Sequence, residues 1–426
     1  MKSAFFPKIF PLRLPVAAPD VQFANQLQVG LATVCMGFSE IISVVALVIL
    51  TSELESTEGI KLVGMPMVII KGQFRNLSGP NPSELASTAA NAKGTAEALI
   101  ASSGTLKVEI KHEWGLMPFT AWRATAEKVP LKVGSSIGIL EDKSRGTVGL
   151  YLKSSYGKRV LTCAHVVSPL LCDLEHLVDP LSPDIFSKGG CITSPGRLDC
   201  IIKMKALLEN KKTNLPDKLL PWLVAAKRIC GTVHCGKLGA DDLGYREDWA
   251  LIELHNGFVG ANGIWWRMED FQLLREADGV QPSSAAFRGS IVAATNPSLG
   301  VDDIWFKDGA STRWTSARLV LTEVELFIRG SVIGATESAD IHPVKFIKAK
   351  VLMMASLDRY PFAIRGDSGS GVFKVTDDGQ DVVFGGMVVS EFKPIIGERL
   401  TIVVPATRVL AQVAKKTGVP WEVAID

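Results

Sequence analysis

Residues 365–373 read RGDSGSGVF, and they place Ser368 in a glycine-rich turn directly before a short apolar run that favours a strand. A serine hydroxyl is a poor nucleophile unless a base takes its proton during attack. Glycines beside the serine let backbone N–H groups turn towards a developing negative charge, because no side chain obstructs the turn. The stretch therefore predicts a nucleophile at the edge of a strand, and the rest of the chain must supply its base.

Two further segments supply the residue types that this chemistry needs. Residues 160–167, VLTCAHVV, place His165 at the end of an apolar run, and residues 247–254, EDWALIEL, place Asp248 just before another. Imidazole is a suitable general base, and a buried carboxylate fixes its tautomer and stabilises the imidazolium that forms. We expect His165 to act as the base, Asp248 to orient it and Ser368 to attack.

Each of these residues also has an ordinary interpretation. A histidine on its own is more often a structural core residue than a catalytic one, and only the company of the other two segments favours catalysis at His165. Asp241 and Asp242 compete with Asp248, but they fit a solvated turn better. Ser370 competes with Ser368, but only Ser368 directly follows Gly-Asp.

The three segments, in the order His, Asp, Ser, resemble the chymotrypsin-like (trypsin-like) serine protease superfamily. Residues 162–165 are similar to its T-[AS]-A-H segment, residues 248–252 to D-[IL]-A-L-[LI], and residues 366–369 match G-D-S-G. The region 130–418 most closely resembles uncharacterised trypsin-like proteins of fungi. The resemblance implies two six-stranded antiparallel β-barrels and the hydrolysis of peptide bonds through an acyl-enzyme.

The resemblance also implies how a substrate is held. The backbone N–H groups of Gly366 and Ser368 are expected to line an oxyanion hole, where each donor contributes on the order of 3 kcal/mol. Val389 and Ser390 are expected on the strand that binds substrate. Phe362, six residues before the serine, takes the position at the base of the specificity pocket, which favours a small or apolar side chain in the substrate.

The chain departs from the family pattern at two places. Val166 follows His165 where secreted members have a cysteine, so the disulfide at that loop is missing. The basic-Ile-Val-Gly-Gly activation site is also absent, so no cleaved N-terminus is available to pair with Asp367. The loop that carries the serine must therefore be ordered in another way or be left unformed.

Short apolar runs separated by turns continue from about residue 129 and indicate an all-β fold. Residues 201–212 and 219–230 have apolar residues at helical spacing and predict a helical insertion. The predicted organisation is an N-terminal region of unknown role with a linker (1–126) and a protease domain (127–418), which consists of a first barrel (130–262) with a helical insert (about 198–230), a second barrel (about 280–405) and a C-terminal helix (405–417).

The composition of the whole chain excludes several other classes of protein. Its 426 residues are 47% hydrophobic and 21% charged, which excludes a disordered chain and leaves enough apolar residues for a substantial core. The formal net charge is +2, so charge gives no argument for binding nucleic acid. We expect a peptide or protein substrate, no nucleic-acid partner and no cofactor, while the oligomeric state stays open.

Seven cysteines without a C-x-x-C pair, and no recognisable signal peptide, favour a reduced, cytoplasmic protein. The alternative is a membrane anchor at residues 31–51, a mostly apolar stretch of about the length that a spanning helix needs. Glu40 lies near its middle, where a charge costs on the order of 3 kcal/mol. A buried strand or helix is therefore the favoured interpretation.

Two other interpretations remain open. Cys230, His234 and Cys235, with Cys191 and Cys200 upstream, form a conceivable zinc cluster, but structural zinc usually draws on more regular ligand pairs, so we expect no metal. The fold could also serve as a catalytically silent binding module, since a misformed oxyanion loop would leave no trace in the sequence.

Overall fold

The computed structural model describes fourteen segments of the chain. They are residues 8–10, 29–37, 43–51, 67–76, 130–140, 145–167, 190–209, 215–265, 288–292, 304–330, 345–357, 361–375, 382–394 and 398–424. The predicted linker after residue 76 lies outside these segments.

Six antiparallel strands close into a barrel in the C-terminal half of the chain. Around the barrel they are β14 (Ile304–Gly309), β15 (Arg313–Gly330), β16 (Lys345–Ser356), β19 (Leu400–Pro405), β18 (Val382–Pro394) and β17 (Gly371–Val375). The barrel closes where β17 returns to β14, with Phe373 opposite Phe306. The two rings lie 6.1 Å apart between centroids, and together with Phe384 they fill the inside of the closure.

A second sheet forms from the preceding part of the chain. Its hydrogen-bonded order is β20-β7-β8-β11-β10-β9-β5-β6. The bounds are β5 (Ser136–Ile139), β6 (Gly146–Thr147), β7 (Leu150–Ser154), β8 (Gly157–Thr162), β9 (Cys191–Thr193), β10 (Ile229–Ala240), β11 (Arg246–Leu254) and β20 (Glu422–Val423). All of its pairings are antiparallel, and β11 lies near the middle with all but one of its residues buried.

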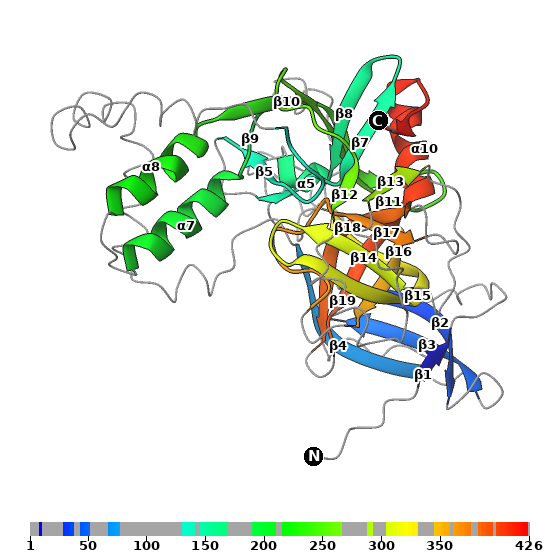
Figure 1. The fold of residues 1–426 in the computed structure, drawn as a ribbon. Coiled ribbons are helices and arrows are strands. Elements are labelled where there is room, and N and C mark those ends of the chain that lie inside the picture. The colour runs from blue at the N-terminus through cyan, green and yellow to red at the C-terminus, as the bar shows by residue number, and fades with distance from the viewer. Residues whose placement is uncertain are drawn as a thin grey trace, which may run out of the picture.

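The described residues also form four helices. They are α5 (Ala164–Val167), α7 (Arg197–Glu209), α8 (Leu215–Ala225) and α10 (Ala406–Thr417). The α7–α8 pair projects away from the strands as the predicted helical insertion (Figure 1). The C-terminal helix α10 ends at Gly418, whose φ of 75° lies in the left-handed region, and whose N–H donates to the carbonyl of Ala414.

The N-terminal part of the chain contributes four strands, β1 (Lys8–Phe10), β2 (Val29–Gly37), β3 (Ser43–Thr51) and β4 (Met67–Asn76). Within the stretch considered as an anchor, β2 and β3 pair in antiparallel fashion as strands. None of the helices formed by the described residues combines the length and the hydropathy that a bilayer crossing requires.

The N-terminal strands hydrogen-bond to the barrel at two places. β2 pairs with β15, and β4 pairs with β18. Two short strands, β12 (Gly263–Trp265) and β13 (Arg288–Val292), pair with one another, and β13 runs parallel to β18. The predicted domain boundaries stay a prediction.

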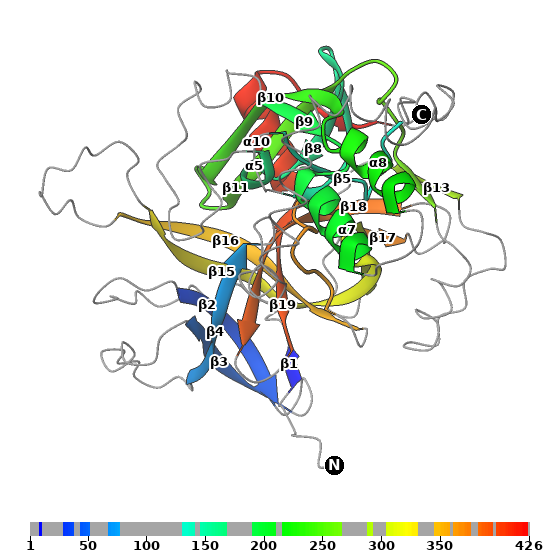
Figure 2. The same cartoon turned by 90° about the vertical axis from the view of Figure 1, so that its left-hand side faces the viewer.

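One hydrophobic core joins the sheet to the barrel. It includes Leu161 and Leu251 from the sheet and Met387 and Val389 from the barrel, all fully buried. Helix α10 contacts both β11 and β18, and Figure 2 shows it beside the strands of the sheet. It buries Val409 and Val413 along one face. The junction between sheet and barrel is therefore a packed interior.

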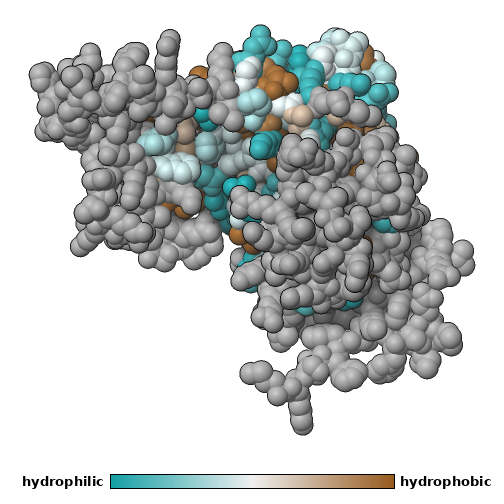
Figure 3. Space-filling model, in the orientation of Figure 1, coloured by the Kyte–Doolittle hydropathy of each residue, from teal (hydrophilic) through white to brown (hydrophobic). Residues whose placement is uncertain are grey.

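Where the described surface is visible in Figure 3, hydrophilic and hydrophobic residues are interspersed.

The all-β class, one closed six-stranded antiparallel barrel, the helical insertion and the C-terminal helix are confirmed. The strands predicted as the first barrel form the second sheet, and the pairings of the described residues do not close it. Strand β10 was not predicted, and it begins at Ile229, inside the second run predicted as helix. Its sequence, ICGTVHCGKLGA, contains three glycines and little strict alternation, so it carries a weak strand pattern.

The close approach of sheet and barrel predicts a glycine position that does not tolerate a side chain. A Cβ at Gly149 would overlap the backbone carbonyl of Gly369, in the loop that carries Ser368. We expect Gly149→Ala to lower the free energy of unfolding by about 1–3 kcal/mol, because backbone must move. Gly190→Ala is the matched control, since the nearest side-chain atom to its Cβ lies at 3.6 Å. Equal denaturant midpoints for the two variants would contradict the prediction.

Candidate functional site

His165 lies in the short helix α5, directly after strand β8 ends at Thr162. The Thr162 hydroxyl donates to the carbonyl of Thr147, and all four residues of α5 are buried against the sheet. The apolar neighbours Val166 and Val167 hold the helix turn in the core, so the imidazole of His165, only 2% exposed, has a restricted position.

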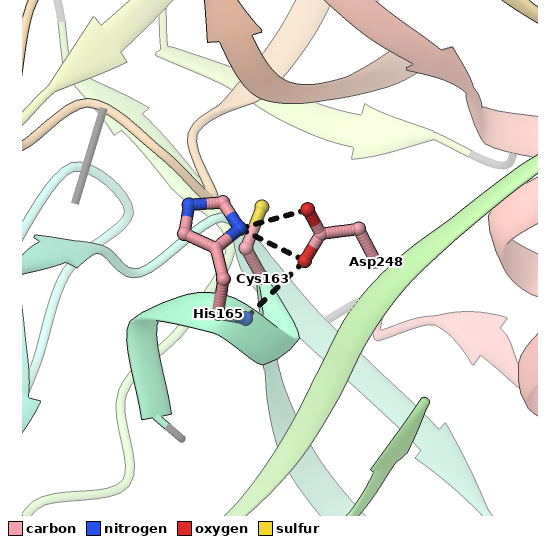
Figure 4. A group of neighbouring side chains, drawn as sticks. All are labelled: Cys163, His165 and Asp248. Atoms are coloured by element: carbon pink, nitrogen blue, oxygen red, sulfur yellow. Dashed lines mark hydrogen bonds and ion pairs between the residues drawn. The ribbon is translucent and has the colours of Figure 1, made fainter. Parts of the chain in front are cut away.

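Asp248 lies on β11, the neighbour of β8 in the sheet, and its carboxylate faces the imidazole (Figure 4). The Nδ1 atom of His165 lies 2.7 Å from Oδ2 and 2.9 Å from Oδ1 of Asp248. The backbone N–H of His165 also donates to Oδ1, at 3.3 Å. A carboxylate can only accept, so Nδ1 carries the proton and the other ring nitrogen is left as an acceptor in the neutral imidazole.

Ser368 lies in the turn before β17, in the barrel. Its Oγ lies 2.9 Å from Nε2 of His165 and 3.3 Å from the carbonyl oxygen of Val389. The sheet thus supplies the imidazole and the carboxylate, and the barrel supplies the hydroxyl. The structure brings together the three side chains that the sequence analysis singled out.

Asp248 is fully buried, and its charge has two partners. Burial alone raises the pKa of this carboxyl, but the attraction of His165 and of Arg246 outweighs burial and lowers the pKa to about 2. Arg246, on the same strand, donates from Nη2 to Oδ2 at 2.7 Å. The carboxylate therefore stays ionised at neutral pH despite its dry surroundings.

The peptide groups around Ser368 are held through their carbonyls. The Arg365 carbonyl accepts from Nη2 of Arg145 at 2.9 Å and from the Ser311 hydroxyl at 2.6 Å. The Asp367 carbonyl accepts from both the N–H and the hydroxyl of Ser370. In a planar trans peptide the N–H points away from the C=O of the same unit. These contacts therefore fix the directions of the N–H groups of the two following residues.

Those two N–H groups belong to Gly366 and Ser368, the predicted oxyanion donors. Neither donates to another residue among those the structure describes. Gly366 has a φ of 100°, in the left-handed region, and a Cβ there would overlap the Ser311 hydroxyl. Both donors are thus held in place without an internal acceptor.

The Asp367 carboxylate, beside Ser368, is also completely buried. Oδ2 accepts from Nζ of Lys307 at 3.2 Å and from the N–H of Ile364 at 3.0 Å, and Oδ1 accepts from the N–H groups of Ser311 and Thr312. Lys307 is itself 0% exposed, and burial lowers its pKa although Asp367 opposes the shift. An internal ammonium group therefore partners Asp367.

The predicted substrate-binding residues are all buried. Phe362 packs in the barrel core near Trp305, and its carbonyl accepts from the Thr315 hydroxyl at 2.7 Å. Val389 and Ser390 lie on β18, next to the hydroxyl of Ser368. Their roles toward a substrate stay predictions.

Three metal-binding side-chain types come together at the site, namely Cys163, His165 and Asp248, whose ligand atoms lie within 4.8 Å of one another (Figure 4). Burial, followed by the charge of Asp248, raises the pKa of the Cys163 thiol well above its usual range. The thiol donates to the Val388 carbonyl at 3.2 Å. A protonated thiol, a protonated Nδ1 and the adjacent Arg246 cation make a poor cation site.

The cysteines considered for zinc form no disulfide among the described residues. Cys163, Cys191, Cys200, Cys230 and Cys235, the five cysteines whose side chains are described, are all free. Burial raises the pKa of Cys200 and of Cys230 to about 12 and that of Cys235 to about 11. These groups remain thiols at neutral pH.

Sequence reasoning missed three charged residues of the site, which are Arg145, Arg246 and Lys307. Two of them carried a readable signal. Arg246 begins strand β11, whose other residues are nearly all buried. Lys307 lies two residues after the buried Trp305 on β14, so strand periodicity places both side chains on the same buried face. The contact of Arg145 with Arg365 spans 220 residues and has no local pattern.

Comparisons with known proteins give similarities in structure alone. No protein-family model and no curated protein matches the chain. The chain is similar to a glutamic acid specific serine protease (13% identity, TM-score 0.35, covering 68% of this chain and 99% of that one). It is also similar to protease A of Thermobifida fusca (10%, 0.34, 69% and 98%) and to a chymotrypsin of Cellulomonas bogoriensis (12%, 0.32, 69% and 100%). Identities and scores this low say nothing about the roles of individual residues.

The buried pair of Lys307 and Asp367 predicts a large loss of stability when the cation is removed. In Lys307→Met the Asp367 carboxylate keeps its backbone donors but loses its counter-charge, which costs about 3–5 kcal/mol of the free energy of unfolding. Urea unfolding measures the loss, with Lys132→Met at an exposed lysine as the control. The prediction is wrong if both lysine variants unfold at the same urea concentration.

The lowered pKa of Asp248 predicts a specific loss of stability in acid. A carboxyl with a pKa of 3.8 in the unfolded chain and about 2 in the folded one stabilises the fold above about pH 4, and this contribution disappears as the pH falls from about 4 to 2. It amounts to about 2 kcal/mol. Denaturant unfolding at several pH values should show that Asp248→Asn lacks this part of the acid sensitivity. Parallel stability curves for the variant and the parent would contradict the prediction.

Proposed function

We propose that this protein is a serine endopeptidase in which Ser368 attacks, His165 acts as general base and then general acid, and Asp248 orients the imidazole. The observation that carries the proposal is the continuous chain of contacts from the Asp248 carboxylate through both ring nitrogens of His165 to the Ser368 hydroxyl, with 2.7 Å and 2.9 Å at its two ends. Such a chain is what proton transfer from a serine requires.

The geometry suggests the steps of the reaction. As Oγ of Ser368 bonds to the substrate carbonyl carbon, its proton moves to Nε2 of His165, and the carbonyl oxygen becomes an oxyanion. The N–H groups of Gly366 and Ser368 stabilise this oxyanion by donating hydrogen bonds to it. The imidazolium then protonates the leaving amine, and water releases the acyl group by the same steps in reverse.

The substrate class and the setting of the reaction are also proposals. A peptide or protein substrate follows from the proposed chemistry, with Val389 and Ser390 beside the substrate chain and Phe362 favouring a small or apolar side chain. The close resemblance to fungal trypsin-like proteins rests on sequence motifs alone. A cytoplasmic location rests on the cysteine pattern.

Two observations favour the alternative function of a catalytically silent protease-fold module. Ser368 is 0% exposed, so a substrate can reach it only after some of the surrounding chain moves. In addition, β4 pairs with β18 from Ser390 to Pro394, which is the edge where a substrate strand is expected to add. A peptide could pair there only after β4 leaves.

A fluorophosphonate probe separates the two functions, because it is small and does not need the strand edge. If the protein is an enzyme, the full chain is labelled covalently, and labelling is lost in Ser368→Ala and falls by at least about a hundredfold in His165→Ala. Ser154→Ala, at a turn between β7 and β8, is the control that keeps full labelling. Labelling is measured by mass spectrometry of the intact protein.

Two results would contradict the enzyme proposal. One is a folded wild-type protein that takes up no probe, which supports the silent module. The other is labelling that persists in Ser368→Ala, which places the reactive group elsewhere. Labelling of Ser368 without cleavage of any peptide would keep the chemistry and leave the strand edge as the barrier to substrates.

A further inference from the structure

Arg246 introduces a second cation at the carboxylate that orients the proposed base. Its side chain is 2% exposed, and its Nη2 atom lies 2.7 Å from Oδ2 of Asp248. Nδ1 of His165 lies 2.7 Å from the same oxygen. The guanidinium and the imidazole therefore share one acceptor in a dry environment, where charges interact strongly.

The surroundings of this cluster hold the guanidinium in place. Nη1 of Arg246 lies 3.4 Å from the Ser390 hydroxyl on β18, and the Arg246 carbonyl accepts from the Gln412 side chain on α10. The same Gln412 amide contacts Asp241, which lies just before β11. Because strands from both sheets and a helix enclose it, Arg246 is not free to turn away from Asp248.

The other titratable groups near the carboxylate are few. His165 lies in α5, Cys163 lies directly before that helix, and Arg246 lies on β11. The contact from β18 is the uncharged Ser390. Cys163 stays a neutral thiol. In the described part of the chain, the charges that bear on Asp248 are therefore those of His165 and Arg246.

The shared carboxylate changes the charge balance of proton transfer. With Arg246 present, the cluster of Arg246, Asp248 and His165 is neutral at rest and becomes singly positive when His165 takes the proton of Ser368. Without Arg246, the same step would take the cluster from singly negative to neutral. A nearby like charge disfavours a protonated imidazole.

We infer that Arg246 is a positioning residue that acts through Asp248 to keep His165 unprotonated down to lower pH, and so sets the acid limit of the reaction. The inference rests on the proposed function in assigning a reaction to the site. The effect on the imidazole itself does not depend on activity, so the two can be tested apart.

The first experiment is an NMR titration of the histidine signals in the full chain carrying Ser368→Ala, with the His165 signal assigned by its loss in His165→Asn. Arg246→Gln keeps a hydrogen-bond donor and removes the charge, Arg246→Met removes both, and Arg246→Lys keeps the charge. Both neutral variants should raise the pH midpoint of the His165 signal, because the like charge is gone. Arg246→Lys should stay close to the parent.

The second experiment follows the rate of fluorophosphonate labelling against pH with Ser368 intact. The acid limb of the rate profile should move to higher pH by the same amount in Arg246→Gln and return towards the parent in Arg246→Lys. A merely structural role would lower the rate at every pH without moving the limb.

Each outcome counts for or against the inference. An unchanged midpoint in the neutral variants overturns it, even where labelling proceeds and the proposed function stands. A raised midpoint in a protein that takes up no probe supports the inference and rejects the function. Failure of both neutral variants to fold would assign Arg246 a purely structural role and would also overturn it.

Discussion

The burial of the Asp367 carboxylate is the constraint on which the site depends. An ionised carboxylate in a dry interior is strongly unfavourable unless donors surround it. The donors that it collects are Lys307, the Thr312 hydroxyl and the N–H groups of residues 311, 312 and 364. These groups come from the β14–β15 hairpin and from the loop of Ser368 itself. Satisfying one charge therefore draws together the segments that position Ser368.

A second buried carboxylate, Asp248, also lies near Ser368, and its partners are of a different kind. Asp367 is held mainly by backbone, which cannot change its protonation, whereas Asp248 is held by an imidazole and a guanidinium. The first arrangement is rigid and serves to shape the loop. The second contains the imidazole of His165, the group proposed to take and return a proton. The division separates a structural carboxylate from one that contacts the proposed base.

Local sequence patterns predicted most of the turns and strands that are formed by residues near one another in the chain. The glycine-rich turn at Ser368, the strand that ends before His165 and the apolar strand at Asp248 are all visible within about eight residues. Strand β10 was missed because its three glycines weaken the alternation that marks a strand. Its register against β11 depends on tertiary packing that a single sequence does not display.

The partners of the charged residues that support the site could not be predicted, for a physical reason. Lys307 and Asp367 are 60 residues apart, and Arg145 and Arg365 are 220 apart, so nothing local links them. Strand periodicity can indicate that a lysine points inward, but it does not identify the group that the lysine contacts. The departure from the family activation site raised the question of how Asp367 is satisfied, but only the structure identified the internal lysine.

The position of β20 has a consequence for biosynthesis. Residues 422–423 pair with β7, near residue 152, and the Ala424 N–H donates to the carbonyl of Tyr151. A ribosome holds back a few tens of residues of a growing chain, so His165 and Asp248 emerge long before this edge of the sheet is covered. Strand β20 can dock only after translation has passed it. A nascent chain therefore carries a sheet whose β7 edge stays uncovered until residues 422–423 have emerged.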